Sequence, residues 1–452
     1  MSKEFHYRWT WKLKSTPEEL WPLVADTNRF NYDAGLSVVR RDSENGELPN
    51  ARRRLSFSSV GVGVAWEEEP FEWVEPRRFG VRRNYFKGPI AHMRVQVDLE
   101  PIATGTELTY QIWVRERNFL GRLAIPIQIG ILTARSFASV FQQYDRQLRQ
   151  SDYSARVYAT GDVRFEPGGK ERLARIHKAL LGKGVSPDLL FPIVEFIATA
   201  SDLQASQLRP YELADLWGQP RRDLLETCLS ATREGLLEYE WHLLCPLCRG
   251  AKARSQSLGD VVSRVHCDTC NIDFEVNFDQ SVELTFHPNP SIRSILIGEY
   301  CIAGPRVTPH VVSQQLLQSG EERSIQQSLE SGRYRLRTLQ VSGGQYLKAD
   351  DLEPRHNVRI RLGHEGWATD ELAVNSDASI TMANDTSEEQ LFVLERLALN
   401  DQAATGADVI RLQRFRDLFA EEALRPGERI SVGSQAIVFT DLFGSTEFYN
   451  SV

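Results

Sequence analysis

The chain has 452 residues, with 53 Lys and Arg against 61 Asp and Glu, so its net charge is −8. A hydrophobic fraction of 41% and a charged fraction of 25% exclude a disordered or collagen-like protein. The length predicts about three domains. The acidic balance argues against a protein built mainly to coat nucleic acid, so we expect no nucleic-acid partner.

We expect neither an export signal nor a membrane span. Residues 1–5 lack the apolar core of a secretory signal. The nearest candidate for a span, residues 123–134, is short and contains Pro126 and Gln128. A cytoplasmic protein follows, in which paired cysteines bind metal or do redox chemistry rather than form structural disulfides.

The first third of the chain predicts one strand, a short helix, a run of strands and a closing helix. Aromatic and polar residues alternate from Phe5 to Leu13, which predicts a strand with one buried face. Thr16 and Glu19 form a capping box that starts a helix. Strand-like segments then run to about residue 115. A closing helix is predicted by apolar residues at helical spacing: Phe137, Val140, Phe141, Tyr144 and Leu148.

This order resembles the SRPBCC or START-like superfamily of polyketide cyclases and lipid-transfer proteins, over residues 1–155. The resemblance implies a helix-grip fold whose sheet encloses an apolar cavity, and hence a small apolar or lipid ligand. The alternative is that the aromatic residues simply fill the core. Basic clusters such as residues 52–54 would suit a lipid head group, but solvated strand faces explain them more simply.

Residues 156–240 are helical in pattern and winged-helix-like. A helix over residues 212–217, a turn at 218–220, a second helix over 221–232 and extended chain follow one another. DNA recognition would need base-reading polar residues on the second helix. The apolar residues there are typical of a core, so an interdomain scaffold is favoured over DNA binding: Leu224, Leu225, Cys228 and Leu229.

Two Cys-x-x-Cys pairs in residues 241–280, separated by eighteen residues, match a four-cysteine zinc pattern. Four thiolates saturate Zn²⁺ and leave no open position, so this ion would support folding without catalysing. An oxidised redox pair is the alternative. His266 is expected to be a bystander, and Cys228 and Cys301 to be ordinary buried thiols. The predicted zinc ligands are Cys245, Cys248, Cys267 and Cys270.

Strand signals return over residues 281–400, where an antiparallel sandwich or barrel is expected to serve as a regulatory or spacer domain. A connecting segment, residues 401–429, carries a helix predicted from about Ala407 to Ala423.

Residues 430–452 contain a short buried strand followed by Asp441 and a Gly-Ser-Thr turn. A carboxylate at a strand end can hold Mg²⁺, and such a turn opening a helix presents N–H groups to phosphate. An ordinary Asp-capped turn explains the same residues equally well.

Residues 439–446 resemble the opening motif of class III adenylate and guanylate cyclases, and residues 412–419 resemble the helix that joins regulatory modules to that domain. The resemblance implies that Asp441 binds catalytic Mg²⁺ or Mn²⁺. The second metal Asp, the nucleotide-selecting residues and the Asn/Arg pair of that family would come after Val452. Two-metal chemistry needs both carboxylates, so we expect this polypeptide alone to convert no ATP or GTP. The phosphates would be held by Phe443, Gly444, Ser445 and Thr446.

The sequence therefore predicts an α+β multidomain protein. The main hypothesis is the sensor part of a signal-transducing cyclase, a homodimer that makes cyclic nucleotide and pyrophosphate when complete. The alternatives are a stand-alone START-like protein that binds a hydrophobic ligand, and a zinc-containing DNA-binding regulator.

Overall fold

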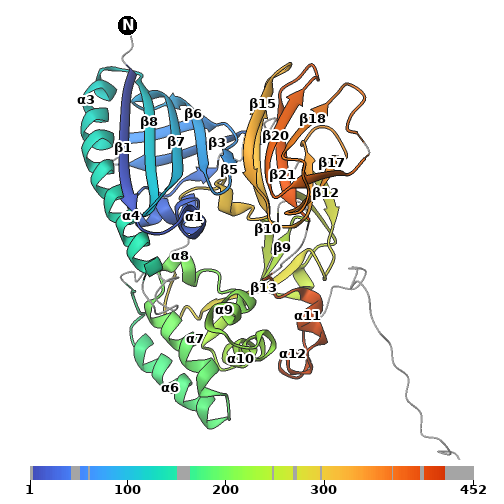
Figure 1. Ribbon diagram of the computed structural model, residues 1–452. Coiled ribbons are helices and arrows are strands. Elements are labelled where there is room, and N and C mark those ends of the chain that lie inside the picture. The colour runs from blue at the N-terminus through green and yellow to red at the C-terminus, as the bar shows by residue number, and fades with distance from the viewer. Residues whose placement is uncertain are drawn as a thin grey trace, which may run out of the picture.

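The computed structural model is α+β and contains a large mixed sheet. Figure 1 shows one sheet with a long helix along the side of its strand β1 (Glu4–Leu13). A helical unit lies below this sheet and a β-rich part lies beside it. The structure describes residues 4–41, 51–59, 62–149, 163–246, 249–267, 272–295, 298–368, 370–397 and 402–422.

The first part of the chain has the helix-grip arrangement that the sequence predicted. After the first strand come α1 (Pro17–Val24) and α2 (Thr27–Asp33), then the remaining strands and one long helix. That helix consists of α3 (Phe119–Ile127), the π-helical turn η3 (Gln128–Thr133) and α4 (Ala134–Arg149). The antiparallel strands lie in the order β1 (Glu4–Leu13), β8 (Gly105–Glu116), β7 (Ile90–Ile102), β6 (Arg78–Lys87), β4 (Val62–Glu68), β3 (Arg53–Ser59) and β2 (Arg40–Arg41).

Local sequence signals account for both helix starts. The predicted capping box is confirmed, because Glu19 N donates to Thr16 Oγ1 at 3.2 Å and Thr16 N donates to Glu19 Oε2 at 2.9 Å. The carboxylate of Asp26 accepts from Arg29 N at 3.0 Å and so begins α2. The buried face of α4 is also the predicted one: Phe137, Val140, Phe141 and Tyr144.

The long helix is more apolar than its sequence pattern predicted. Within the described residues, Phe119–Arg149 is the one helix with the length and composition of a membrane span, and its most apolar 18-residue window has a mean hydropathy of 1.4. Length and composition also fit a helix that covers a folded core, and the inner face of this one packs on the sheet.

The sheet does not end with the first module. Strand β5 (Glu72–Val74) pairs with β6 on one side and with β14 on the other. The sequence predicted a separate sandwich domain here, and it could not show this fusion, because pairing between strands more than 200 residues apart leaves no local pattern. The continuation is β14 (Val311–Leu317), β21 (Gln390–Arg396), β16 (Gly332–Arg337), β17 (Gln345–Asp350) and β19 (Leu372–Asn375).

A second sheet completes the β-rich part, and the two sheets share a core, as expected of a sandwich. Leu336 and Phe392 from the first sheet pack in one cluster with Ile360 and Ile380 from the second. The second sheet contains β15 (Glu322–Ser328), β20 (Asp377–Asn384) and β18 (Asn357–Leu362).

The middle of the chain forms a helical unit that leads into a small sheet. The apolar residues of its helix α10, from Leu224 to Leu229, are buried as predicted. The helices are α6 (Gly169–Gly182), α7 (Pro187–Thr199), α8 (Asp202–Ala205), α9 (Pro210–Trp217) and α10 (Arg221–Arg233). The strands are β9 (Leu237–Leu244), β10 (Ala251–Ser255) and β13 (Val282–Pro288), beside a hairpin of β11 (Arg264–Cys267) and β12 (Ile272–Glu275).

The single helix predicted from about Ala407 to Ala423 is wrong. The chain forms two short helices, α11 (Gly406–Arg411) and α12 (Gln413–Leu418), with Leu412 extended between them at φ −71° and ψ 124°. The break lets the Phe415 ring reach the buried Trp241, with centroids 6.1 Å apart, and this packing outweighs helical continuity.

Candidate functional site

The inner wall of the helix-grip module is aromatic along β1. Phe5, Tyr7, Trp9 and Trp11 face the long helix but remain only half-buried. The Tyr7 ring stacks on Trp9 at 5.8 Å, and a Cβ on Gly130 would come within 2.9 Å of Tyr7. A side chain at position 130 would therefore displace the Tyr7 ring. The described residues leave part of the apolar surface of the four rings uncovered.

The other end of the module is filled. The Phe30 ring lies 4.7 Å from Phe137 and 5.0 Å from Phe141, and Tyr110 lies 4.8 Å from Phe137. Burial raises the pKa of Tyr110, so its hydroxyl stays neutral. Core filling thus describes this end, whereas half-buried aromatic rings remain along β1.

An ion pair lies on the same inner wall. Arg83 Nε on β6 donates to Glu68 Oε2 on β4 at 2.8 Å, and the guanidinium lies 5.9 Å from the Trp66 ring. The Glu68 side chain is 2% exposed and that of Arg83 is 21% exposed. Within the part of the chain that the structure describes, Glu68 Oε1 has no hydrogen-bond partner. Because a buried acceptor without a partner costs free energy, this oxygen is suited to accept from a ligand.

A distant segment, residues 298–304, closes the module beside this pair. Tyr300 N and Cys301 N donate to Asn28 Oδ1 at 2.7 and 3.1 Å, and Asn31 Nδ2 donates to the Tyr300 carbonyl at 2.9 Å. Burial raises the pKa of the Cys301 thiol, and nearby Glu68 raises it further. Cys301 was expected to be an ordinary buried thiol, and no local signal could have placed it beside Arg83 and Glu68.

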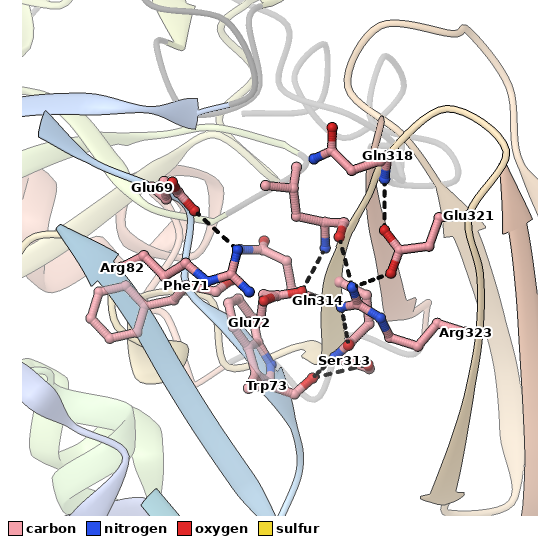
Figure 2. A network of polar contacts seen from close by, with 12 residues as sticks. Glu69, Phe71, Glu72, Trp73, Arg82, Ser313, Gln314, Gln318, Glu321 and Arg323 are labelled. Atoms are coloured by element: carbon pink, nitrogen blue, oxygen red, sulfur yellow. Dashed lines mark hydrogen bonds and ion pairs between the residues drawn. The ribbon is translucent and has the colours of Figure 1, made fainter. Parts of the chain in front are cut away.

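A polar network joins this module to the β-rich part along β5 and β14 (Figure 2). Trp73 Nε1 donates to the Val311 carbonyl at 2.9 Å, and Ser313 Oγ donates to the Trp73 carbonyl at 3.0 Å. Arg323 pairs with both Glu72 and Glu321.

A polar cleft of about 410 Å³ lies beside these residues. Its charges largely pair within the network, since Arg82 also faces Glu69 at 3.9 Å. The cleft is therefore better described as a junction between modules than as a ligand site.

Two of the four predicted zinc ligands lie in the described residues. Cys245 follows β9 and Cys267 ends β11, and both are buried. Arg249, with φ 55°, returns the chain so that its N–H donates to the Cys245 carbonyl at 2.9 Å. One buried thiol therefore follows β9 and the other ends β11. Cys248 and Cys270 lie outside the described residues.

Within those residues, no group of three His, Cys, Asp or Glu side chains gathers to hold a metal ion. The zinc site therefore stays a prediction. His266 faces Asp273 at 3.1 Å. The residues of the cyclase-like motif also lie outside the described residues: Asp441, Phe443, Gly444, Ser445 and Thr446.

Residues 174–300 match a family of unknown function (DUF5939). None of the curated proteins matches the chain. Among solved structures, the chain is similar to the Zhui aromatase/cyclase from Streptomyces sp. R1128, at 14% identity over 33% of this chain and 99% of that one, with a TM-score of 0.27.

Two further solved structures cover a similar share. An uncharacterised protein from Rhizobium leguminosarum is 10% identical over 32% of this chain and 97% of its own, with a TM-score of 0.25. A protein from Thermus thermophilus is 15% identical over 33% of this chain and 100% of its own, with a TM-score of 0.24.

Proposed function

We propose that the helix-grip module binds a small, largely apolar molecule that carries one hydrogen-bond donor. The observation that carries this proposal is the half-buried aromatic row of β1 on the same inner wall as Glu68 Oε1, a buried acceptor with no partner in the described chain. Covering the rings releases water from apolar surface, and a donor to Glu68 fixes the orientation of the molecule.

Arg83 has a positioning role in this proposal. Its hydrogen bond holds one carboxylate oxygen of Glu68, so the other oxygen points in a fixed direction. Tyr85 lies on the same strand, and burial raises the pKa of its hydroxyl. The polar part of the wall therefore offers an acceptor at Glu68 and the neutral hydroxyl of Tyr85 nearby.

Two connections would couple ligand binding in the module to the rest of the chain. The segment carrying Cys301 leads from the helical unit to the β-rich part, and the β5–β14 pairing joins the two sheets directly. A ligand shifts such a structure only if it binds two arrangements unequally. Regulation of a class III cyclase domain is the output that the resemblance of residues 439–446 supports.

We propose a structural role for zinc in the same chain. Cys245, Cys248, Cys267 and Cys270 would hold the ion and tie the turn after β9 to the β11–β12 hairpin. The closed set of thiolates supplies folding energy and leaves no position for a substrate.

The test uses the full 452-residue chain. The purified protein is denatured, extracted with organic solvent, and the released small molecules are measured by mass spectrometry. Trp9→Ala removes one inward ring, and Thr10→Ala changes the next, outward residue of the same strand as a control. We expect one recurring molecule that falls about tenfold in Trp9→Ala and is unchanged in Thr10→Ala. Equal amounts in the two variants would contradict the proposal.

A further inference from the structure

The outward face of α3 and η3 is apolar and exposed. Six large apolar side chains there are each between 50% and 70% exposed. Single exposed apolar residues are ordinary, but a contiguous strip of this size marks an interaction surface. The strip consists of Phe119, Leu120, Leu123, Ile127, Ile131 and Leu132.

Contacts of the inward face of the same helix hold the apolar strip on the outside. Ile125 and Ile129 are buried in the module core. A Cβ on Gly121 would come within 2.2 Å of the Pro89 carbonyl, so the helix touches the β6–β7 turn closely. Thr133 Oγ1 donates to the Gln128 carbonyl at 2.9 Å and satisfies an acceptor of the π-helical turn. The helix cannot turn its apolar strip inward without losing these contacts.

Basic residues border the strip, and acidic residues are absent from it. The sequence from Arg117 to Tyr144 contains three arginines and no Asp or Glu, in a chain whose net charge is −8. Arg122 and Arg135 are exposed on the helix itself. The exposed Lys87 lies on the β6–β7 hairpin, whose Pro89 carbonyl accepts from Arg117 N at 2.9 Å.

We propose that this strip docks the protein on an anionic lipid bilayer, with α3 and η3 lying in the plane of the membrane interface. An apolar helix face with basic neighbours and no acidic ones has the pattern of an interfacial helix. Its opposite face is packed on the sheet, so the helix lies on the bilayer rather than crossing it. Figure 1 shows α3 at the outer side of the sheet, away from the helical and β-rich parts.

A second copy of the chain is a poorer occupant. A two-fold interface places the same patch on both partners, so the arginines of one strip would face those of the other. Carboxylates are absent from this stretch of sequence, and the like charges would remain unneutralised. Docking through this strip does not require a molecule at the small-molecule site.

The experiment is flotation of the full chain with vesicles of phosphatidylcholine alone or mixed with phosphatidylglycerol, at low and high salt. The test variant is Leu123→Glu/Ile127→Glu, at two exposed positions where the new carboxylates stay solvated. The control, Phe191→Glu/Leu352→Glu, makes the same change at exposed apolar residues of other parts, 54% and 91% exposed. Light scattering after size exclusion reports whether each protein is a monomer or a dimer.

We expect the wild type to float with the anionic vesicles and to be released by salt. The Leu123/Ile127 variant should bind about tenfold or more weakly, whereas the control should bind like the wild type. Arg122→Gln/Arg135→Gln should lower the preference for phosphatidylglycerol. Absence of wild-type flotation, or equal flotation of test and control variants, would overturn the proposal. A dimer that only the test variant breaks, without vesicle binding, would overturn it in favour of a second copy.

Discussion

The carboxylate of Glu68 is held by Arg83 through one oxygen, at 2.8 Å from Nε, while its other oxygen is buried without a partner in the described chain. The pair lies on the inner wall that also carries the half-buried rings. A fully satisfied core would not leave this acceptor open. We therefore interpret the pair as the polar part of a binding site.

Replacing Glu68 tests this interpretation. Glu68→Gln keeps the shape but removes the charge that pairs with Arg83, so we expect a loss of about 1–3 kcal/mol in the free energy of unfolding. Retention of the extracted small molecule should fall about tenfold as well. Glu67→Gln, at the preceding, outward-facing residue of β4, is the control and should change neither. Full retention of the small molecule in Glu68→Gln would show that Glu68 does not contribute to the binding site.

The closing helix depends on one carboxylate. Asp145 Oδ1 accepts from Lys14 N, Ser15 N and Ser15 Oγ at 3.0, 2.9 and 2.9 Å, and thereby ties α4 to the end of β1. Asp145→Ala leaves these donors without their acceptor, and we expect about 2–4 kcal/mol of destabilisation in urea unfolding. The exposed Gln142→Ala on the same helix should change stability little. Similar unfolding midpoints for the two variants would contradict this role.

Glu75 gives the junction between the two sheets a pH dependence. Burial raises the pKa of this carboxyl to about 7, with Glu330 raising it and Arg306 lowering it. A carboxyl whose folded pKa lies above its unfolded value favours folding when protonated. Stability should therefore fall as the pH rises from about 4.5 through 7, by at most about 3 kcal/mol.

The measurement is the urea midpoint of the wild type and of Glu75→Gln at several pH values. The Gln side chain cannot ionise, so the variant should gain stability relative to the wild type as the pH rises. A constant difference between the two proteins across that range would show that Glu75 does not titrate there.

The zinc prediction has a direct chemical test. We expect one zinc per chain by elemental analysis, lost in Cys245→Ser and in Cys267→Ser because each removes a thiolate from a closed set. Cys228→Ala, at a buried thiol of α10, should keep the metal. A preparation with far less than one zinc per chain would refute the site.

Local patterns predicted local structure well. The capping box of Thr16 and the buried stripe that starts at Phe137 could both be predicted from the sequence, because each depends on residues three or four positions apart. The inward row on β1 followed from strict alternation. Together with the family resemblance, these signals predicted the helix-grip module.

Packing between segments far apart in the chain could not be predicted from the sequence. The break at Leu412 arises because Phe415 packs on Trp241 from a distant strand. Cys301 reaches Arg83 and Glu68 through a segment anchored by Asn28, and β5 pairs with β14 across the module boundary. The partnerless oxygen of Glu68 also had no sequence signal, because nothing in three consecutive glutamates, residues 67–69, indicates which carboxylate is buried.

Native mass spectrometry of the intact 452-residue chain tests the central claim most directly. We predict that the protein carries one small organic molecule per chain under gentle ionisation, released by collisional activation and about tenfold less abundant in the Trp9→Ala variant. A wild-type mass that equals the polypeptide with bound metal alone, unchanged when apolar molecules are added, would contradict the account.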